Sequence, residues 1–270
     1  MWSEILVYGS FIKNAFLKML AYRLRYYTGI FTYLFFVAVY YFIWKAVYSG
    51  KPPDATINGF TLNEMLTYIT VGWIARSSYF SNIDDDIDDL VRTGQISIYL
   101  IKPVNFQLMM FAQALGESLF RILFFTVPVG LVVLWAFPVN PPKDSLALLL
   151  FGFSSLLGFL IMCALNFLIG LLAFYLNSID GILRAKYNLM NFASGLLLPL
   201  TFLPAWLSHA LELLPFKAIA YVPLKFYLGK IPNSEIATVL GEECLWLTAL
   251  VAAGAWCWSR AAAKLTLQGG

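Results

Sequence analysis

Charged residues, histidine and cysteine are all scarce in this chain, and each scarcity argues against a class of function. Asp, Glu, Lys and Arg make up 12% of the 270 residues, and hydrophobic residues make up 60%. That charged share is about half of what a soluble domain carries, so a soluble enzyme is a poor description. The net charge is only +3, which gives no reason to expect a nucleic-acid partner.

The histidine and cysteine positions also give little reason to expect a metal site or a disulfide bond. The single histidine, His209, has no second histidine or carboxylate cluster at ligand spacing. The cysteines, at positions 163, 244 and 257, lie in apolar runs without metal-type spacing. We expect free thiols and no metal site.

Nucleotide-binding and hydrolase motifs are missing from the sequence. No G-x-x-x-x-G-K-[ST] is present, because the Gly-Lys pairs at 50–51 and 229–230 are followed by Pro52 and Ile231. G-x-S-x-G and H-E-x-x-H are absent as well. The chain is therefore not expected to be an enzyme by itself or to bind a cofactor of its own.

What the sequence does contain is a series of long apolar runs. A bilayer crossing needs about 20 apolar residues. The runs predict six membrane spans, at 28–47, 61–80, 106–137, 145–177, 187–204 and 236–259. The predicted fold is an all-α integral membrane protein, with residues 1–270 forming one transmembrane domain.

The stretch 206–232 is apolar but interrupted by Pro215, Pro223 and Pro232. Proline ends helices, and the resulting pieces are too short to cross a bilayer. We interpret this stretch as short re-entrant or interfacial helices before the last span.

Lysine and arginine positions orient the chain. Ten of them outside the spans fall on the side of the N-terminus, against six on the other side. The positive-inside rule then places both termini in the cytoplasm.

Residues 3–27 precede the first span and form an imperfect amphipathic pattern. Phe16 lies on the apolar arc, while Lys18 and Arg25 lie on the opposite one. This pattern predicts a helix lying on the inner membrane surface.

A polar island at 82–93 follows the second predicted span and holds five of the fifteen acids. Ser81 and Asp84 have capping-box-like spacing, and Gly94 is a typical helix terminator. Arg92 in the last turn suits the helix dipole. One apolar stripe completes the pattern, formed by Ile83, Ile87, Leu90 and Val91. We expect a short cytoplasmic helix that docks onto a partner, although many acidic loops are simply solvated.

Charges inside the spans are few. Glu117 and Arg121 are spaced i, i+4 near the inner end of the third span, which favours a structural ion pair over a proton relay. Asn166 in the fourth span is expected to hydrogen-bond between helices. Glu64, Glu242 and Glu243 lie near outer span ends, where they could line an exit path or simply be interfacial.

The surface helix and the string Ile-Asp-Asp-Leu-Val-Arg-Thr-Gly-Gln-Ile-Ser-Ile-Tyr-Leu-Ile-Lys-Pro-Val-Asn at 87–105 resemble the ABC-2 type permeases. The branch grouped with multidrug and daunorubicin exporters is the most similar. The tail at 263–270, Ala-Lys-Leu-Thr-Leu-Gln-Gly-Gly, also resembles that branch.

The resemblance implies a type V exporter-like architecture in a bacterial cell membrane. Two permease chains, copies or paralogues, would pair above two ABC ATPase subunits that bind ATP and magnesium. Helix 82–93 would be the coupling helix that enters the ATPase, and 3–27 the connecting helix beside it. The implied coupling residues are Ile83, Asp84, Asp86, Ile87, Leu90, Val91, Arg92 and Gly94; the implied connecting residues are Phe16, Lys18, Arg23 and Arg25.

The leading interpretation is the membrane subunit of an ATP-driven exporter for a hydrophobic or amphipathic substrate, in contact with membrane lipid. A stand-alone secondary carrier is the main alternative, and matched broken helices or inverted repeats would favour it. A membrane scaffold or immunity protein without transport is a third. Copurification of an ATPase would discriminate between them.

Overall fold

The computed structural model describes residues 2–21, 24–52, 54–79, 81–137, 139–176 and 178–268. Within these residues the named elements are all helical, which confirms the predicted all-α class. The α-helices are α1 (Trp2–Ala21), α2 (Leu24–Val47), α3 (Leu62–Ser78), α4 (Ile83–Arg92), α5 (Ile96–Leu100), α6 (Phe106–Arg121), α7 (Val127–Ala136), α8 (Ser145–Gly170), α9 (Asp180–Ala193), α10 (Ala205–Glu212), α11 (Tyr221–Tyr227) and α12 (Ile236–Gln268). Short π or 3-10 segments are η1 (Ile122–Thr126), η2 (Leu171–Phe174), η3 (Leu200–Phe202), η4 (Pro215–Ile219) and η5 (Asn233–Glu235).

Several helices can cross a bilayer. Among the described residues, three stretches are long and apolar enough: Phe106–Ala136, Ser145–Phe174 and Asn233–Ala263. They coincide with the third, fourth and sixth predicted spans, and the shorter apolar helix Phe31–Val47 coincides with the first. The chain is therefore a multi-pass membrane protein, while the count of six crossings stays a prediction.

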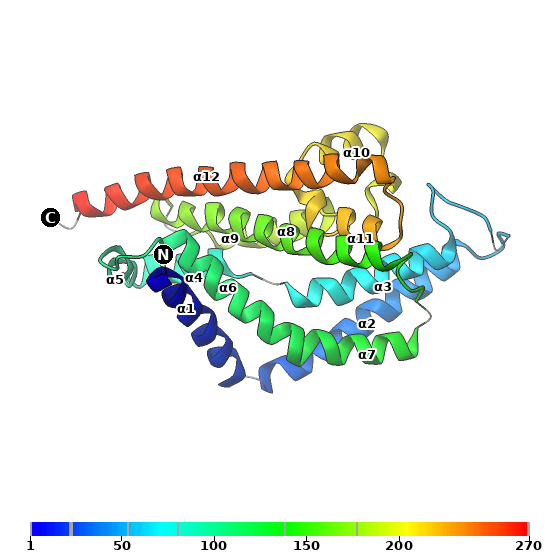
Figure 1. Ribbon diagram of the computed structural model, residues 1–270, viewed down its shortest axis with the longest axis horizontal. Helices are drawn as coiled ribbons and strands as arrows, with labels where there is room; N and C mark the ends of the chain where they lie inside the picture. The colour runs from blue at the N-terminus through cyan, green and yellow to red at the C-terminus, as the bar shows by residue number, and fades with distance from the viewer. Residues whose placement is uncertain are drawn as a thin grey trace.

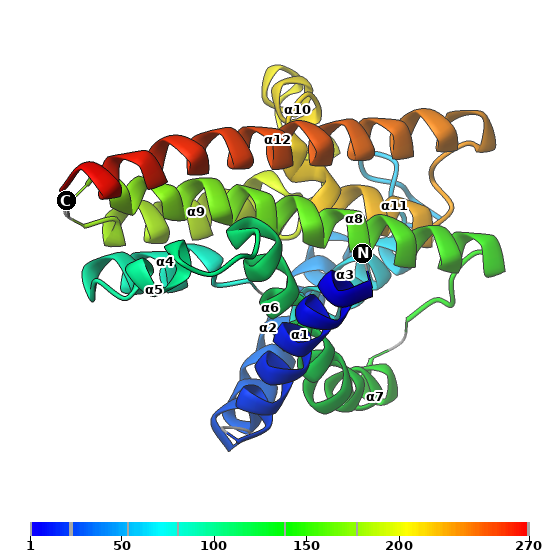
Figure 2. The same cartoon turned by 60° about the vertical axis from the view of Figure 1, so that its left-hand side comes forward.

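Helix α8 is the centre of the fold. Figures 1 and 2 show α8 and α12 running side by side along the long axis, and α11 and α4 also contact α8. Of the most apolar 18 residues in Ser145–Phe174, which comprises α8 and η2, 67% are buried inside the chain. The corresponding share in Asn233–Ala263, which holds most of α12, is 6%. Helix α8 thus forms the protein core, whereas α12 leaves its apolar surface for lipid or another chain.

A π turn bends the helix that runs from Phe106 to Ala136. Pro128 has no N–H, and its ring clashes with the carbonyl four residues earlier. The N–H of Val127 donates to the carbonyl of Ile122, which is the five-residue spacing of η1. Beyond this turn α7 diverges from α8, whereas α6 still contacts it (Figure 1).

The uninterrupted span predicted at 187–204 is not formed. Helix α9 ends at Ala193, and Gly195 follows with a φ of 78°, which a residue with a side chain rarely adopts. Only the short 3-10 segment η3 follows Pro199, and the next α-helix, α10, begins after Pro204. The N–H of Tyr221 donates to the carbonyl of Ser194 over 3.0 Å, so α11 starts beside this break. The re-entrant nature of 206–232 stays a prediction.

The N-terminal boundary also differs from the prediction. Helix α1 ends at Ala21 and α2 begins at Leu24, so the last residues of the predicted 3–27 helix belong to α2. Arg23 lies outside the described residues, as does the side chain of Arg25. At the other end of the chain, α12 continues beyond the predicted limit of 259.

Helix α1 is seated tightly across α6. A Cβ atom at Gly116 would lie 2.2 Å from the carbonyl oxygen of Ile12, so only glycine permits this approach. The ring of Phe16 packs edge-on against Phe120, with centroids 5.9 Å apart. Phe16 therefore contacts this chain's own α6.

Candidate functional site

Helix α4 occupies the polar island and is one residue shorter at each end than predicted. It spans Ile83–Arg92, with three aspartates in its first turn and an arginine in its last. It terminates at Gly94, which has a φ of 72° and donates its N–H to the carbonyl of Val91 over 3.1 Å.

The capping box expected at Ser81 and Asp84 is not formed. The N-cap is Asn82, whose side chain makes no capping hydrogen bond. The Oγ atom of Ser81 accepts only a long bond of 3.5 Å from the N–H of Ile83. The Asp84 carboxylate points into the chain instead.

The apolar stripe of α4 is already occupied. Ile83 is 2% exposed and Ile87 is 0% exposed, in the cluster that α8 and η2 contribute to. A Cβ atom at Gly170 would lie 2.9 Å from the Cα of Asp84, so α4 sits directly on α8. The expectation that this stripe faces a partner is therefore corrected for these two isoleucines. Leu90 and Val91 are half-buried.

A buried polar cluster fastens α4 to two other helices. The carboxylate of Asp84 accepts a short hydrogen bond from Nζ of Lys186 on α9 and has no exposed side-chain surface. Lys186 also donates to Oδ1 of Asn166 on α8 over 3.1 Å. Asn166 in turn donates to the carbonyl of Ser81 over 2.8 Å. We call these four residues the α4 clamp.

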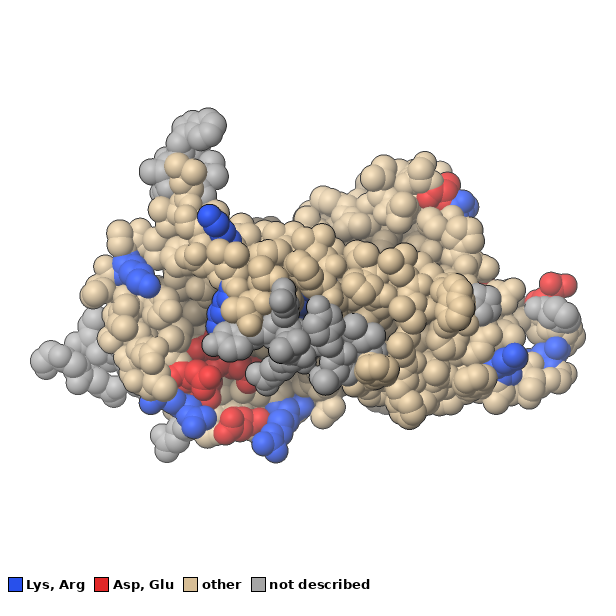
Figure 3. Space-filling view, turned by 90° about the horizontal axis from the view of Figure 1, so that it is seen from below, with Lys and Arg blue, Asp and Glu red and all other residues tan. Residues whose placement is uncertain are grey.

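The other face of α4 is acidic and open. Asp85, Asp86 and Asp89 are exposed, and so is Arg92, which pairs with Asp88 one turn earlier. Figure 3 shows acidic side chains gathered at the end of the molecule that carries α4, with basic side chains around them. A partner that meets α4 therefore meets carboxylates.

A cavity of about 580 Å³ lies between α1, α4, α5 and α6. Lys18 lines it from α1, Asp86 and Asp89 from α4, and Glu117 from α6. Leu90 adds an apolar wall. The cavity therefore brings together Lys18, one of the implied connecting residues, and Asp86 and Leu90, two of the implied coupling residues.

The surroundings of this cavity change the pKa of the Asp86 carboxyl. Surrounding protein removes water and raises the pKa of its carboxyl to about 7, and the nearby Glu117 carboxylate raises it further while Lys18 opposes the shift. The side chain remains solvent-accessible through the cavity mouth, which screens part of this effect. Loss of surrounding water also raises the pKa of the Asp85 carboxyl, and the neighbouring Asp84 carboxylate raises it further.

Glu117 and Arg121 lie one helical turn apart at the end of α6. Their direct ion pair stays a prediction, and Glu117 faces the cavity.

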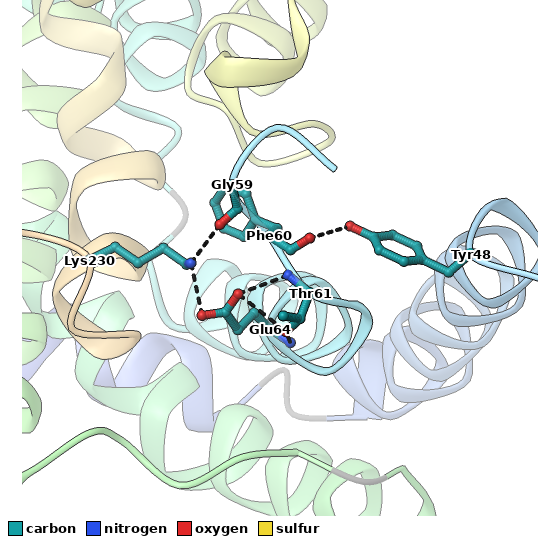
Figure 4. A network of polar contacts seen from close by, with 6 residues as sticks. All are labelled: Tyr48, Gly59, Phe60, Thr61, Glu64 and Lys230. Carbon is teal, nitrogen blue, oxygen red and sulfur yellow. Dashed lines mark hydrogen bonds and ion pairs between the residues drawn. The ribbon is translucent and has the colours of Figure 1, made fainter. Parts of the chain in front are cut away.

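The opposite end of the molecule carries a second polar network, shown in Figure 4. Thr61 and Glu64 form a complete capping box at the start of α3. Lys230, from the loop after α11, pairs with Glu64 at 2.8 Å and donates to the carbonyl of Gly59 at 2.8 Å. Tyr48 donates to the carbonyl of Phe60 at 2.7 Å.

Sequence reasoning missed the partners in both networks. The Thr-x-x-Glu spacing at 61–64 is a readable capping signal. No local pattern links Lys186 to Asp84 or Lys230 to Glu64, because each pair joins segments more than 100 residues apart. Both pairs depend on tertiary packing.

Together these features define a multi-pass membrane protein with a rigidly seated surface helix at one end. A family model described as ABC-2 family transporter protein matches residues 34–269. The chain belongs to the ABC-2 family of transporter proteins and is a permease component, the membrane part of an ABC transporter rather than a catalytic enzyme itself. Family membership implies association with an ABC ATPase. Among curated proteins, none matches the chain significantly.

Proposed function

We propose that this permease is the membrane subunit of an ATP-driven exporter and that its ATPase subunits dock on the exposed acidic face of α4. The supporting observation is the division of α4 into two faces. One face is buried on α8, with Ile87 0% exposed, and the other presents Asp85, Asp86 and Asp89. A helix that is held on one side and open on the other suits a docking element.

The α4 clamp supports a role in transmitting motion. Lys186 and Asn166 tie α4 to α9 and α8, and Gly170 allows direct backbone contact. A push on α4 is then carried into α8 and α9, because buried polar contacts and close packing resist independent sliding. The elements that would tilt to open a path outward are α3, which occupies the second predicted span, and α9, whose last residues begin the fifth.

The partner surface follows from charge complementarity. Carboxylates on α4 favour lysines or arginines in the ATPase cleft, and Leu90 in the neighbouring cavity favours an apolar contact. Docking of this kind weakens as salt concentration rises, because the exposed charges are screened. ATP and magnesium would be bound by the ATPase subunits.

The remaining parts of the proposal follow the family. Two permease chains, identical or paralogous, would form the path in a bacterial cell membrane with both termini in the cytoplasm. The cargo would be hydrophobic or amphipathic, in keeping with the largely apolar composition of the chain; the family match does not extend to the multidrug and daunorubicin branch. The mostly apolar exposed surface of α2 and α12 is available for lipid and for the second chain.

The decisive experiment is affinity purification of the tagged chain from gently solubilised native membranes. The test variant is Asp86→Lys with Asp89→Lys, which reverses the acidic face and leaves the buried stripe intact. The matched control is Asp54→Lys with Glu235→Lys, two exposed acids at the other end of the molecule, one in the loop after α2 and one in η5.

An ATPase that copurifies with the wild type and the control, and is lost from the test variant, supports the proposal. An ATPase that binds all three equally excludes the acidic face as the docking surface. If no ATPase copurifies with any of them, a secondary carrier or a scaffold becomes the better description.

A further inference from the structure

A second cavity lies among the apolar helices and shares no lining residue with the α4 clamp. It has a volume of about 360 Å³ and is lined by α3, η1, α7, α8 and α11. This volume falls within the range of roughly 300–1,000 Å³ that is typical of small-molecule sites. We call it the lateral groove.

The lateral groove is long and apolar. It follows α3 from Val71 to Tyr79, which corresponds to roughly 12 Å at about 1.5 Å per residue. Ile74, Leu134 and Phe151 contribute apolar walls. The described residues that line it include hydroxyl groups but no charged side chain. An apolar, uncharged ligand fits such walls.

The bend at Pro128 opens the groove towards the bilayer. Because η1 turns α7 away from α8, the two helices separate in front of α3 (Figure 1). Ile122 is 38% exposed and Leu134 is 53% exposed at this opening. Both belong to the membrane-spanning stretch Phe106–Ala136, so the opening lies at membrane depth.

One hydroxyl group in the groove has no protein partner. The Oγ atom of Ser155 is buried and unbonded within the described part of the chain. By contrast, Tyr79 donates to the carbonyl of Ile219 over 2.6 Å, and Thr126 is bonded to Ser77 over 2.9 Å. Four of the five hydroxyl groups that line the groove are hydrogen-bonded within the chain, so a ligand there is held mainly by apolar contacts.

We propose that the lateral groove binds one acyl chain of a bilayer lipid, which enters sideways between α7 and α8. A helix of a second permease copy is about 10 Å across with its side chains, so it is too wide for a cavity of this volume. A flexible hydrocarbon chain is narrow enough and matches the uncharged walls. This site does not depend on the ATPase docking proposed above.

The test is photo-crosslinking of the full-length chain in lipid nanodiscs of phosphatidylcholine and phosphatidylglycerol. A small fraction of the phosphatidylcholine carries a diazirine in one acyl chain, and adducts are mapped by mass spectrometry. The groove is filled with Ala75→Phe or with Ser155→Leu, which also removes the unpaired hydroxyl. The control is Ala136→Phe, at an exposed position of α7.

We expect adducts on the residues that line the groove, with a several-fold loss in both filling variants and no change in the control. Adducts on Leu245 and Trp256 of α12, which are exposed, give an internal reference that also reveals misfolding. Adducts spread evenly over all exposed apolar residues and unaffected by filling would overturn the proposal. Because no ATPase takes part, this result is independent of the docking experiment.

Discussion

Two lysine–carboxylate pairs join distant parts of this chain, one at each end, in contrasting surroundings. In the α4 clamp, the side chains of Lys186 and Asp84 are 13% and 0% exposed. At the other end, the side chains of Lys230 and Glu64 are 21% and 29% exposed. The first pair is enclosed by helices, whereas the second joins a loop to the start of α3 (Figure 4).

The comparison shows that the contribution of a lysine–carboxylate pair to stability depends on how deeply the pair is buried. Removing one partner of a buried pair leaves an uncompensated charge, which is strongly destabilising. Removing one partner of a partly exposed pair costs little, because water replaces it. The α4 clamp is therefore suited to hold a helix rigidly. The Lys230–Glu64 pair, called the outer pair below, mainly orders a loop.

The largest expected effect comes from breaking the α4 clamp. Lys186→Met leaves the Asp84 carboxylate buried without its cation, and we expect a loss of about 3–5 kcal/mol in the free energy of unfolding. Denaturant titration in detergent measures this loss. The double variant Lys186→Met with Asp84→Leu should recover most of it, because both charges are then gone. A single variant as stable as the wild type would show that the pair does not hold α4.

The next effect tests the contact between α4 and α8. In Gly170→Ala, the new Cβ would lie 2.9 Å from the Cα of Asp84 and 3.0 Å from the Cβ of Ile87. We expect a cost of about 1–3 kcal/mol from overpacking, measured in the same titration. Gly152→Ala on the same helix is the control, since no heavy atom lies within 4 Å of its Cβ. Equal stability of the two variants would contradict the close seating of α4.

A smaller effect is expected at the outer pair. Glu64→Gln removes the ion pair with Lys230 but keeps a side chain that can complete the capping box with Thr61. The expected loss is about 0–1 kcal/mol and should shrink further in high salt. A loss as large as that of Lys186→Met would erase the contrast between the two pairs.

The smallest effect concerns pH and the exposed face of α4, because solvent at the exposed Asp86 side chain screens most of the pKa shift. The pKa of Asp86 is raised to about 7, above the unfolded value near 3.8, so the folded chain holds this proton more tightly. The resulting stability is fully present below the unfolded pKa and is lost as pH rises through about 7. Asp86→Asn should flatten this decline in thermal unfolding scans between acidic and neutral pH. An unchanged slope in the variant would assign the decline to another group.

Local sequence patterns predicted the position and bounds of α4, but they did not predict what its apolar side packs against. The acids in the first turn, Arg92 in the last and Gly94 beyond it predict the helix almost to the residue. The same pattern also led to the expectation that the apolar stripe faces a partner, because amphipathicity shows which side of a helix is apolar but not what covers that side. In the structure, the chain's own α8 covers Ile83 and Ile87.

The spans divide in a similar way. Long apolar runs predicted the helices at 106–136 and 145–174, since no other element satisfies backbone groups in lipid. The run at 187–204 also predicted a span, yet the helix ends at Ala193, before Gly195 and the prolines that follow it. The π turn before Pro128 was not predicted either, because a proline inside a helix can be accommodated in several ways.

By itself the sequence determined that this is an all-α membrane protein with a polar helix that ends at Gly94. Composition and hydrophobic periodicity act through local hydrogen bonding and burial, so they can be read along the chain. Only the tertiary structure decided which face of α4 is free, which lysine neutralises Asp84, and where α7 and α8 part to form the lateral groove. Those features depend on contacts between residues far apart in sequence, and such contacts exist only after the helices have packed.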